Sequence, residues 1–238
     1  MSNLKAVILA GGKGTRLRPY TVVLPKPLMP VGDYPILEVI IKQLVPAGFN
    51  QITLAINHQA ALFRSFFEDG EKWNANIDFS LENEPLGTMG PLTLIDNLPD
   101  DFLVMNGDIL TDLSYSALYN NHLNSGAWLT ISSYKRIQDI DYGVLEVNEN
   151  RSLSGFKEKP NIPFEVSMGI YILNRKALDL IPKDKYYGFD HLVLDLLSAN
   201  KKINVVLHEG YWLDIGRPDD YMKAIDEFDS MKHIFLHE

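Results

Sequence analysis

The 238-residue chain contains no cysteine, which excludes disulfide frameworks, thiolate catalysis and cysteine-based zinc sites together. It has no apolar run of membrane-spanning length, and residues 6–10 are too short for the core of a signal peptide. Basic residues are few, since 22 Lys and Arg against 31 Asp and Glu give a net charge of −9. We therefore expect a cytoplasmic protein that has neither nucleic acid nor a membrane as a partner.

Apolar runs and helical periods alternate along the first half of the chain. Strands are predicted at residues 6–10, 52–56, 77–81 and 102–105, and helices at 35–47, 60–67 and 89–96. This alternation predicts an α/β fold with a doubly wound, mostly parallel sheet, Rossmann-like in its winding. The second half has less helix and adds a partly antiparallel region, with strands predicted at 128–133, 144–147, 153–157 and 166–173. A last helix is predicted at about 218–232.

A glycine-rich loop, Gly11-Gly12-Lys13-Gly14-Thr15-Arg16, follows the first predicted strand. Glycines let a backbone approach a phosphate closely, and an arginine can bind phosphate with two hydrogen bonds. The loop is not a Walker motif, because Gly14 stands where Ser or Thr is needed, and not a dinucleotide fingerprint, because Leu17 replaces the last glycine. A rigid Pro-Lys-Pro segment holds Lys26 soon afterwards. The alternative is an ordinary strand-to-loop turn.

Two acidic residues stand in positions that suit a cation. Asp108 lies just beyond the apolar strand at 102–105, and the carboxyl ends of parallel strands are where α/β sheets bind ligands. Asp214 lies inside a largely apolar stretch, where an unpaired carboxylate is costly to bury. The alternative for each is an aspartate that caps a helix or closes a turn.

The chain resembles the sugar-1-phosphate nucleotidyltransferases over roughly residues 4–225. The motifs that carry the resemblance occur in the family's order: "LAGGKGTRLRPYT", "PKPLMPV", "EPLGTMGPL" (84–92), "NGD" (106–108), "DYGVLEV" (141–147), "FKEKP" (156–160), "VSMGIYIL" (166–173) and "YWLDIG" (211–216). The resemblance implies one domain over residues 1–238, with a nucleotide-binding half at about 1–110. It further implies a sugar-binding half at about 111–217, followed by a C-terminal helix and tail at 218–238.

The resemblance also implies roles for particular residues. A catalytic set would handle the phosphates: Arg16, Lys26, Asp108, Lys159 and Asp214, with Mg²⁺ held by Asp108 and Asp214. The nucleotide would lie against Leu9, Ala10, Gly11, Gly12, Gly14, Thr15, Arg16, Lys26, Glu84, Gly87, Thr88 and Asp108. The sugar 1-phosphate would lie against Gly143, Glu158, Lys159 and Gly169. The reaction would be a direct in-line displacement that joins an NTP to a sugar 1-phosphate and releases pyrophosphate.

The branch of the family is suggested by "EPLGTMGPL" and "YWLDIGRPDDY", which look most like mannose-1-phosphate guanylyltransferases. Met89 and the pair Ser167-Met168 depart from that branch at the expected pocket, so a heptose or another related sugar stays open beside mannose. Thymidylyl, uridylyl or cytidylyl transfer is the alternative for the base. A non-catalytic subunit that binds NDP-sugars is the alternative of a different class, and the sequence leaves a homo-oligomer open.

Overall fold

The computed structural model describes residues 3–57 and 59–236. A seven-stranded sheet forms its centre, in the order β12-β8-β11-β6-β1-β4-β5. The strands are β1 (Lys5–Leu9), β4 (Gln51–Ile56), β5 (Asn76–Leu81), β6 (Asp101–Asn106), β8 (Leu129–Asp139), β11 (Asn161–Asn174) and β12 (Ile203–His208). Only β11 runs against its neighbours β6 and β8, and the other pairings in this sheet are parallel. The predicted α/β fold with a mostly parallel sheet is confirmed.

Apolar layers cover both faces of the sheet. Ala6 and Ile8 of β1 point into one core cluster, and Val7 between them points into the other. All three are fully buried, which explains why β1 is a continuous apolar run without alternation. The first face is covered by α1 (Ile36–Leu44), α2 (Ala60–Phe67), α3 (Tyr115–Ser125) and α5 (Pro218–Leu236), and the second by α4 (Phe189–Ser198) with the 3-10 helices Gly90–Leu94 and Arg175–Leu180.

Short elements shape the loops at the edges of the sheet. Three two-stranded ladders pair β2 (Pro30–Val31) with β3 (Tyr34–Pro35), β7 (Ile109–Thr111) with β13 (Trp212–Asp214), and β9 (Val144–Val147) with β10 (Leu153–Lys157). Further 3-10 helices lie at Thr15–Leu17, Tyr20–Val22, Lys26–Leu28 and Glu71–Trp73. Within the described ranges, no helix is long and apolar enough to span a membrane.

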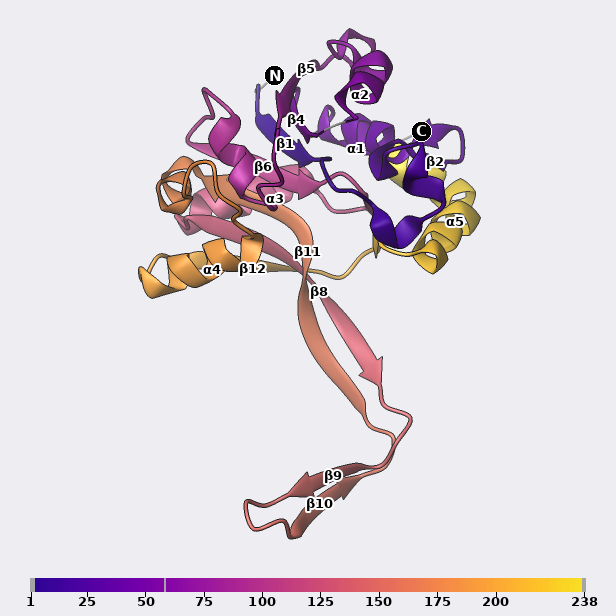
Figure 1. The fold of residues 1–238 in the computed structure, drawn as a ribbon, viewed down its shortest axis with the longest axis vertical. Coiled ribbons are helices and arrows are strands. Elements are labelled where there is room, and N and C mark those ends of the chain that lie inside the picture. Colours follow the sequence, from indigo (N-terminus) through magenta and orange to yellow (C-terminus); the bar gives the residue numbers. More distant parts are fainter. Residues whose placement is uncertain (1–2, 58, 237–238) are drawn as a thin grey trace.

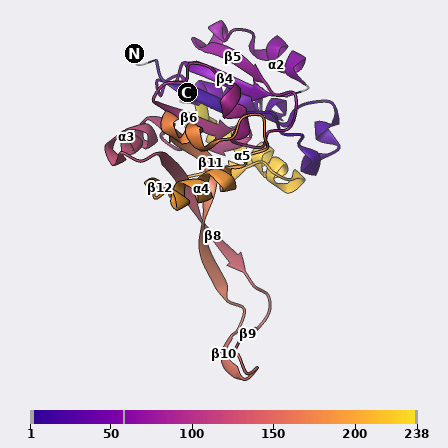
Figure 2. The same cartoon turned by 60° about the vertical axis from the view of Figure 1, so that its left-hand side comes forward.

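A long arm projects from this body, as Figures 1 and 2 show. We define the arm as residues 135–165. It consists of the outer parts of β8 and β11, which pair as a two-stranded ribbon, and of the hairpin β9–β10 at its end. The predicted sugar-binding half of the chain is therefore divided between the body and the arm.

The predicted elements differ from the observed ones mainly in extent. The helix expected at 89–96 is a 3-10 helix, Gly90–Leu94, and Pro35 caps α1 instead of forming its first turn. β8 and β11 are longer than predicted, because each continues into the arm by pairing with the other. The helices α3 and α4 and the edge strand β12 are additional to the predicted set.

Candidate active site

A cavity of about 710 Å³ opens at the carboxyl ends of the parallel strands. Leu9 at the end of β1, Ala55 near the end of β4 and Asn106 at the end of β6 line its floor. This is the edge at which open α/β sheets bind ligands. Its volume is that of a site for a small molecule or nucleotide.

The glycine-rich loop forms one wall and is fixed from two sides. The amide of Asn57 donates to the carbonyl of Gly11, and the Thr21 hydroxyl donates to the carbonyl of Gly14 over 2.7 Å. Gly14 has a φ of 58°, in the left-handed region that favours glycine. A Cβ on Gly11 would stand 2.7 Å from Oε1 of Glu82. The loop is therefore built to bring bare backbone to a ligand.

The opposite wall is the segment 84–90, which is braced by residues far along the chain. The backbone amides of Met89 and Gly90 both donate to the carbonyl of Tyr187, over 3.0 and 3.1 Å. The Leu86 amide donates to the Glu82 carboxylate over 3.2 Å, and burial raises the pKa of that carboxyl. Gly87 has a φ of 82°, and a Cβ there would lie 2.7 Å from the Tyr187 carbonyl oxygen.

Two carboxylates and one lysine meet at the mouth of the cavity. The β7–β13 ladder pairs Asp214 with Ile109, and the Ile215 amide donates to the Asp108 carbonyl over 3.1 Å, so the two aspartates are held as neighbours. Nζ of Lys26 forms an ion pair with Asp108 and lies 3.9 Å from Oδ1 of Asp214. The Lys26 residue is only 8% exposed.

One lysine does not satisfy both acids. Oδ1 of Asp108 is buried and has no hydrogen-bond partner. Burial, and then the neighbouring Asp108, raise the pKa of Asp214, against the opposite pull of Lys26 and Arg16. A divalent cation fits this donor set, because Mg²⁺ takes one or two carboxylates and completes its shell with phosphate oxygens and water. Among the described residues no group of three or more His, Cys, Asp or Glu gathers for a metal, so phosphate oxygens would have to complete the shell.

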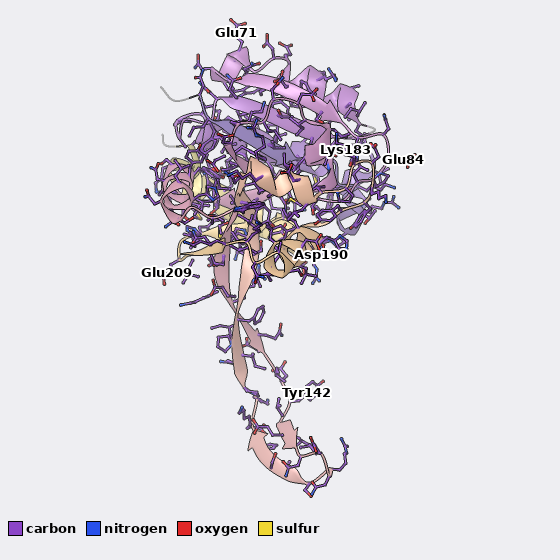
Figure 3. All side chains as sticks on the ribbon, turned by 90° about the vertical axis from the view of Figure 1, so that its left-hand side faces the viewer. Glu71, Glu84, Tyr142, Lys183, Asp190 and Glu209 are labelled. Atoms are coloured by element: carbon purple, nitrogen blue, oxygen red, sulfur yellow. The ribbon has the colours of Figure 1, made fainter. Side chains whose placement is uncertain are left out.

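The structure brings together most of the residues singled out in the sequence. All of the predicted nucleotide-binding residues line the cavity. Asp214 is not a lining residue, but its Oδ1 lies 3.9 Å from Nζ of Lys26, which is one. Gly169 packs against the lining residue Asn106, because a Cβ on Gly169 would lie 2.6 Å from the Asn106 amide. Gly143, Glu158 and Lys159 do not line the cavity of their own chain, because they lie on the arm. Figure 3 shows the separation between Glu84, on the body, and Tyr142, on the arm.

Several lining residues are additional to the predicted set. Asn57 and Glu82 directly follow β4 and β5, so a polar residue after a predicted strand is the signal that could have identified them. Lys13, inside the glycine loop, supplies a further cation, and Tyr186 and Gly216 close the rim. No local pattern predicts Tyr186, which is brought to the cavity by the loop before α4.

An aromatic group adjoins the two aspartates at the root of the arm. The rings of Tyr134 and Trp212 lie 5.3 Å apart, and the Arg136 guanidinium lies over the Trp212 ring at 5.0 Å. The Trp212 indole donates to the carbonyl of Met168 over 3.1 Å, which fixes the ring two residues from Asp214. Aromatic faces with a polar rim suit a sugar or another amphipathic ligand.

The sheet, the cavity at its carboxyl edge and the fixed glycine loop define an α/β protein with a candidate ligand site at the ends of its parallel strands. The family model described as nucleotidyl transferase matches residues 5–230, and the chain belongs to this family. Its relatives include the mannose-1-phosphate guanyltransferases of Yarrowia lipolytica, 36% identical over 93% of this chain, and Schizosaccharomyces pombe, 38% identical over 92%. The chain covers 63% and 62% of the length of those two proteins.

A solved structure has the same overall fold. The crystal structure of HddC from Yersinia pseudotuberculosis complexed with GMP-PN superimposes with a TM-score of 0.72 at 30% identity. The match covers 94% of this chain and 99% of HddC. The family membership expected from the sequence motifs is confirmed.

Proposed function

We propose that the protein transfers a guanylyl group from GTP to a sugar 1-phosphate, giving a GDP-sugar and pyrophosphate. The observation that carries the proposal is the cluster of Lys26, Asp108 and Asp214 at the mouth of a cavity walled by a glycine loop. The cluster places one cation for phosphates beside two carboxylates for a metal, and Oδ1 of Asp108 has no hydrogen-bond partner.

The reaction requires the negative charges of the two phosphates to be neutralised and the phosphates to be aligned, and it does not require a general base. An oxygen of the sugar phosphate forms a bond to the α-phosphorus of GTP, and the bond from that phosphorus to pyrophosphate breaks. The attacking oxygen is already ionised at neutral pH, so no proton has to be removed. A Mg²⁺ ion held by Asp108 and Asp214 would supply positive charge to the phosphates. The glycine-loop amides, Arg16 and Lys26 bind and orient the triphosphate.

Guanine is the proposed base for two reasons. Guanine carries a donor amino group at N2 that the other common bases lack at that position, and the carboxylates of Glu82 and Glu84 line the cavity as acceptors. The similar proteins named above are guanyltransferases or, in HddC, a structure with GMP-PN. Thymidylyl, uridylyl and cytidylyl transfer are the alternatives that a substrate screen must compare.

The sugar is proposed to be mannose or a related heptose, bound near the aromatic group at the root of the arm. The departures from the mannose branch at Met89 and Met168 do not argue against this assignment, because these side chains are buried in the core at 0% and 1% exposure and do not line the cavity. The Ser167 hydroxyl already donates a hydrogen bond to the Tyr171 hydroxyl over 3.0 Å.

A matrix of substrates tests the proposal. Purified protein is incubated with Mg²⁺ and each pairing of GTP, ATP, UTP, CTP or dTTP with mannose, glucose, galactose or heptose 1-phosphate, and pyrophosphate is measured. We expect release with GTP and mannose or heptose 1-phosphate, and its loss when EDTA removes the metal. Release with another base only would refute the guanylyl assignment. No release with any pair, together with GDP-sugar binding by calorimetry, would favour the non-catalytic subunit.

A further inference from the structure

The arm exposes apolar side chains that nothing in its own chain covers. On the ribbon, Ile137 is 67% exposed, and at the end Tyr142 is 78% exposed. A two-stranded ribbon with no further layer is at best marginally stable in water. The arm therefore needs a surface to pack against.

The apolar side chains of the end hairpin gather on one face. Phe156 pairs with Leu145 and Leu153 with Val147 across the β9–β10 ladder, so these four side chains form a patch, which we call the tip patch. They are between 42% and 62% exposed. A continuous exposed apolar patch of this kind marks a contact with another molecule.

The site in the body lacks cations on the side away from the glycine loop. The cations that line the cavity, within the described residues, are Lys13, Arg16 and Lys26, all from the first 26 residues of the chain. The second substrate of the proposed reaction is also a phosphate and meets Asp108 and Asp214. Two lysines stand where the hairpin ends: Lys157, which is paired to Glu146 over 2.7 Å, and Lys159.

The arm carries its tip away from the cavity of its own chain (Figure 3). β8 and β11 stay paired from the body outward, through Val166 with Tyr134 to Asn161 with Asp139. At about 3.3 Å per residue this outer ribbon carries the tip roughly 20 Å beyond the body. Bringing the tip back to the cavity of its own chain would require a bend at the root of the arm, where the β8–β11 register shifts between Ser167 and Tyr171, whereas an approach from a second molecule requires no change in the chain.

We propose that two copies of this chain exchange arms, so that the tip of each packs on the body of the other and brings Lys159 to the partner's Asp108 and Asp214. A second copy is the favoured occupant because each chain has one unsupported arm and one site short of cations, and a two-fold exchange satisfies both at once. Lys159 would also complement the charge at Asp108 and Asp214, where Oδ1 of Asp108 has no hydrogen-bond partner. This inference rests on the proposed function.

Complementation between two inactive chains tests the exchange. Asp108→Asn and Lys159→Ala chains are co-expressed with different tags, and pyrophosphate release is compared with each variant alone. We expect each variant alone to be nearly inactive and the mixture to recover about a quarter of wild-type turnover. Random assembly makes about half of the dimers mixed, and each mixed dimer has one intact site. No recovery in mixed dimers would overturn the exchange, whereas wild-type protein without activity would refute the proposed function instead.

A second experiment does not depend on activity. Because the chain has no cysteine, Glu158→Cys and Asp219→Cys chains can be mixed and treated with a short bismaleimide. We expect a covalent dimer in the mixture that exceeds the amounts from each variant alone. In a chain carrying both cysteines, a cross-link that migrates as a monomer would show contact within one chain and overturn the proposal.

The tip patch gives a matched test of association. Phe156→Ser should convert the dimer to monomer in light scattering while the far-ultraviolet circular dichroism stays unchanged. Leu194→Ser is the control, since Leu194 is 60% exposed on α4 and outside the arm, and it should remain dimeric. A wild-type protein that is monomeric at micromolar concentration would exclude arm exchange.

Discussion

At the scale of single residues, the site depends on how one lysine is shared. Lys26 pairs with Asp108 and approaches Asp214, yet Oδ1 of Asp108 has no partner. Removing the charge of Asp108 therefore leaves the proposed metal with one carboxylate and frees Lys26 from its ion pair. Asp108→Asn should lower turnover by about a hundredfold or more, the order of loss expected for one charge-stabilising group.

Steady-state pyrophosphate release measures this loss. Asp179→Asn is the control, because Asp179 is exposed and lies outside the site, and its turnover should equal that of the wild type. Near-normal turnover of Asp108→Asn would remove Asp108 from the metal site.

The residues that the sequence predicted well are those in continuous loops. The glycine loop and the 84–90 segment each contribute several neighbouring residues to the cavity, so their motifs identify them without knowledge of the fold. Asn57 and Glu82 line the cavity because β4 lies next to β1 and β5 next to β4 in the sheet, which is a property of strand order. Lys159 depends on where the whole arm lies, which no local pattern contains.

A buried histidine makes folding stability depend on pH. His122 contacts Thr130 at 2.8 Å and Asp101 at 3.1 Å, and burial lowers its pKa from the ordinary 6.5 despite the Asp101 charge. Because its pKa is lower in the folded chain, the unfolded chain takes up the proton first as the pH falls through 6.5. The contribution of His122 to the free energy of unfolding is therefore present above pH 6.5 and is lost as the pH falls below it.

Urea unfolding at pH 7.5 and 5.5 checks this dependence. His122→Gln should flatten the pH dependence of the free energy of unfolding, although it lowers stability at pH 7.5 by disturbing the buried contacts. The exposed His233→Gln should keep the wild-type slope. An unchanged slope in His122→Gln would assign the acid sensitivity to other groups.

At the scale of elements, the 84–90 segment forms a cavity wall that is held in place by residues about a hundred positions further along the chain. Gly87 combines a φ of 82° with a close approach to the Tyr187 carbonyl. Gly87→Ala adds strain of about 1–3 kcal/mol and pushes the segment from its brace. We expect lower stability in urea and a higher KM for the nucleotide.

A second glycine serves as a control that separates the loss of stability from the rise in KM. Gly126 also has a positive φ, 62°, but a Cβ there meets nothing within 4 Å, and it ends α3 away from the cavity. Gly126→Ala should lose stability without changing KM. If Gly87→Ala leaves KM unchanged, the 84–90 segment does not hold the nucleotide.

A strong apolar period made some elements predictable, although α4 was missed despite having one, and α3 with its mixed pattern was not predicted. α2 has the predicted bounds, because its buried side chains are phenylalanines at helical spacing. α3 buries Tyr115, Leu118 and His122 among polar neighbours, so its period is hidden, although Ser114 and Gly126 cap its ends. The outer part of β8 is polar in sequence and is a strand only because β11 pairs with it.

At the scale of the whole molecule, the two substrates are proposed to depend on different parts of the assembly. The nucleotide side is built within one body, from the glycine loop, Lys26 and the 84–90 segment. The sugar phosphate is proposed to need Lys159 on the partner's arm. Removing Lys26 should therefore weaken binding of the nucleotide, and removing Lys159 should weaken binding of the sugar phosphate alone.

Thermal unfolding with ligand measures this separation. GTP with Mg²⁺ at a hundred times its Kd stabilises the folded state by about 2.7 kcal/mol, which raises the Tm of a domain of this size by roughly 5–10 °C. Lys159→Ala should keep that rise and lose turnover, whereas Lys26→Ala should lose the rise, because Lys26 is proposed to hold the triphosphate. A Lys159→Ala protein that GTP no longer stabilises would place the arm at the nucleotide instead, and the division of the two substrates between body and arm would be wrong.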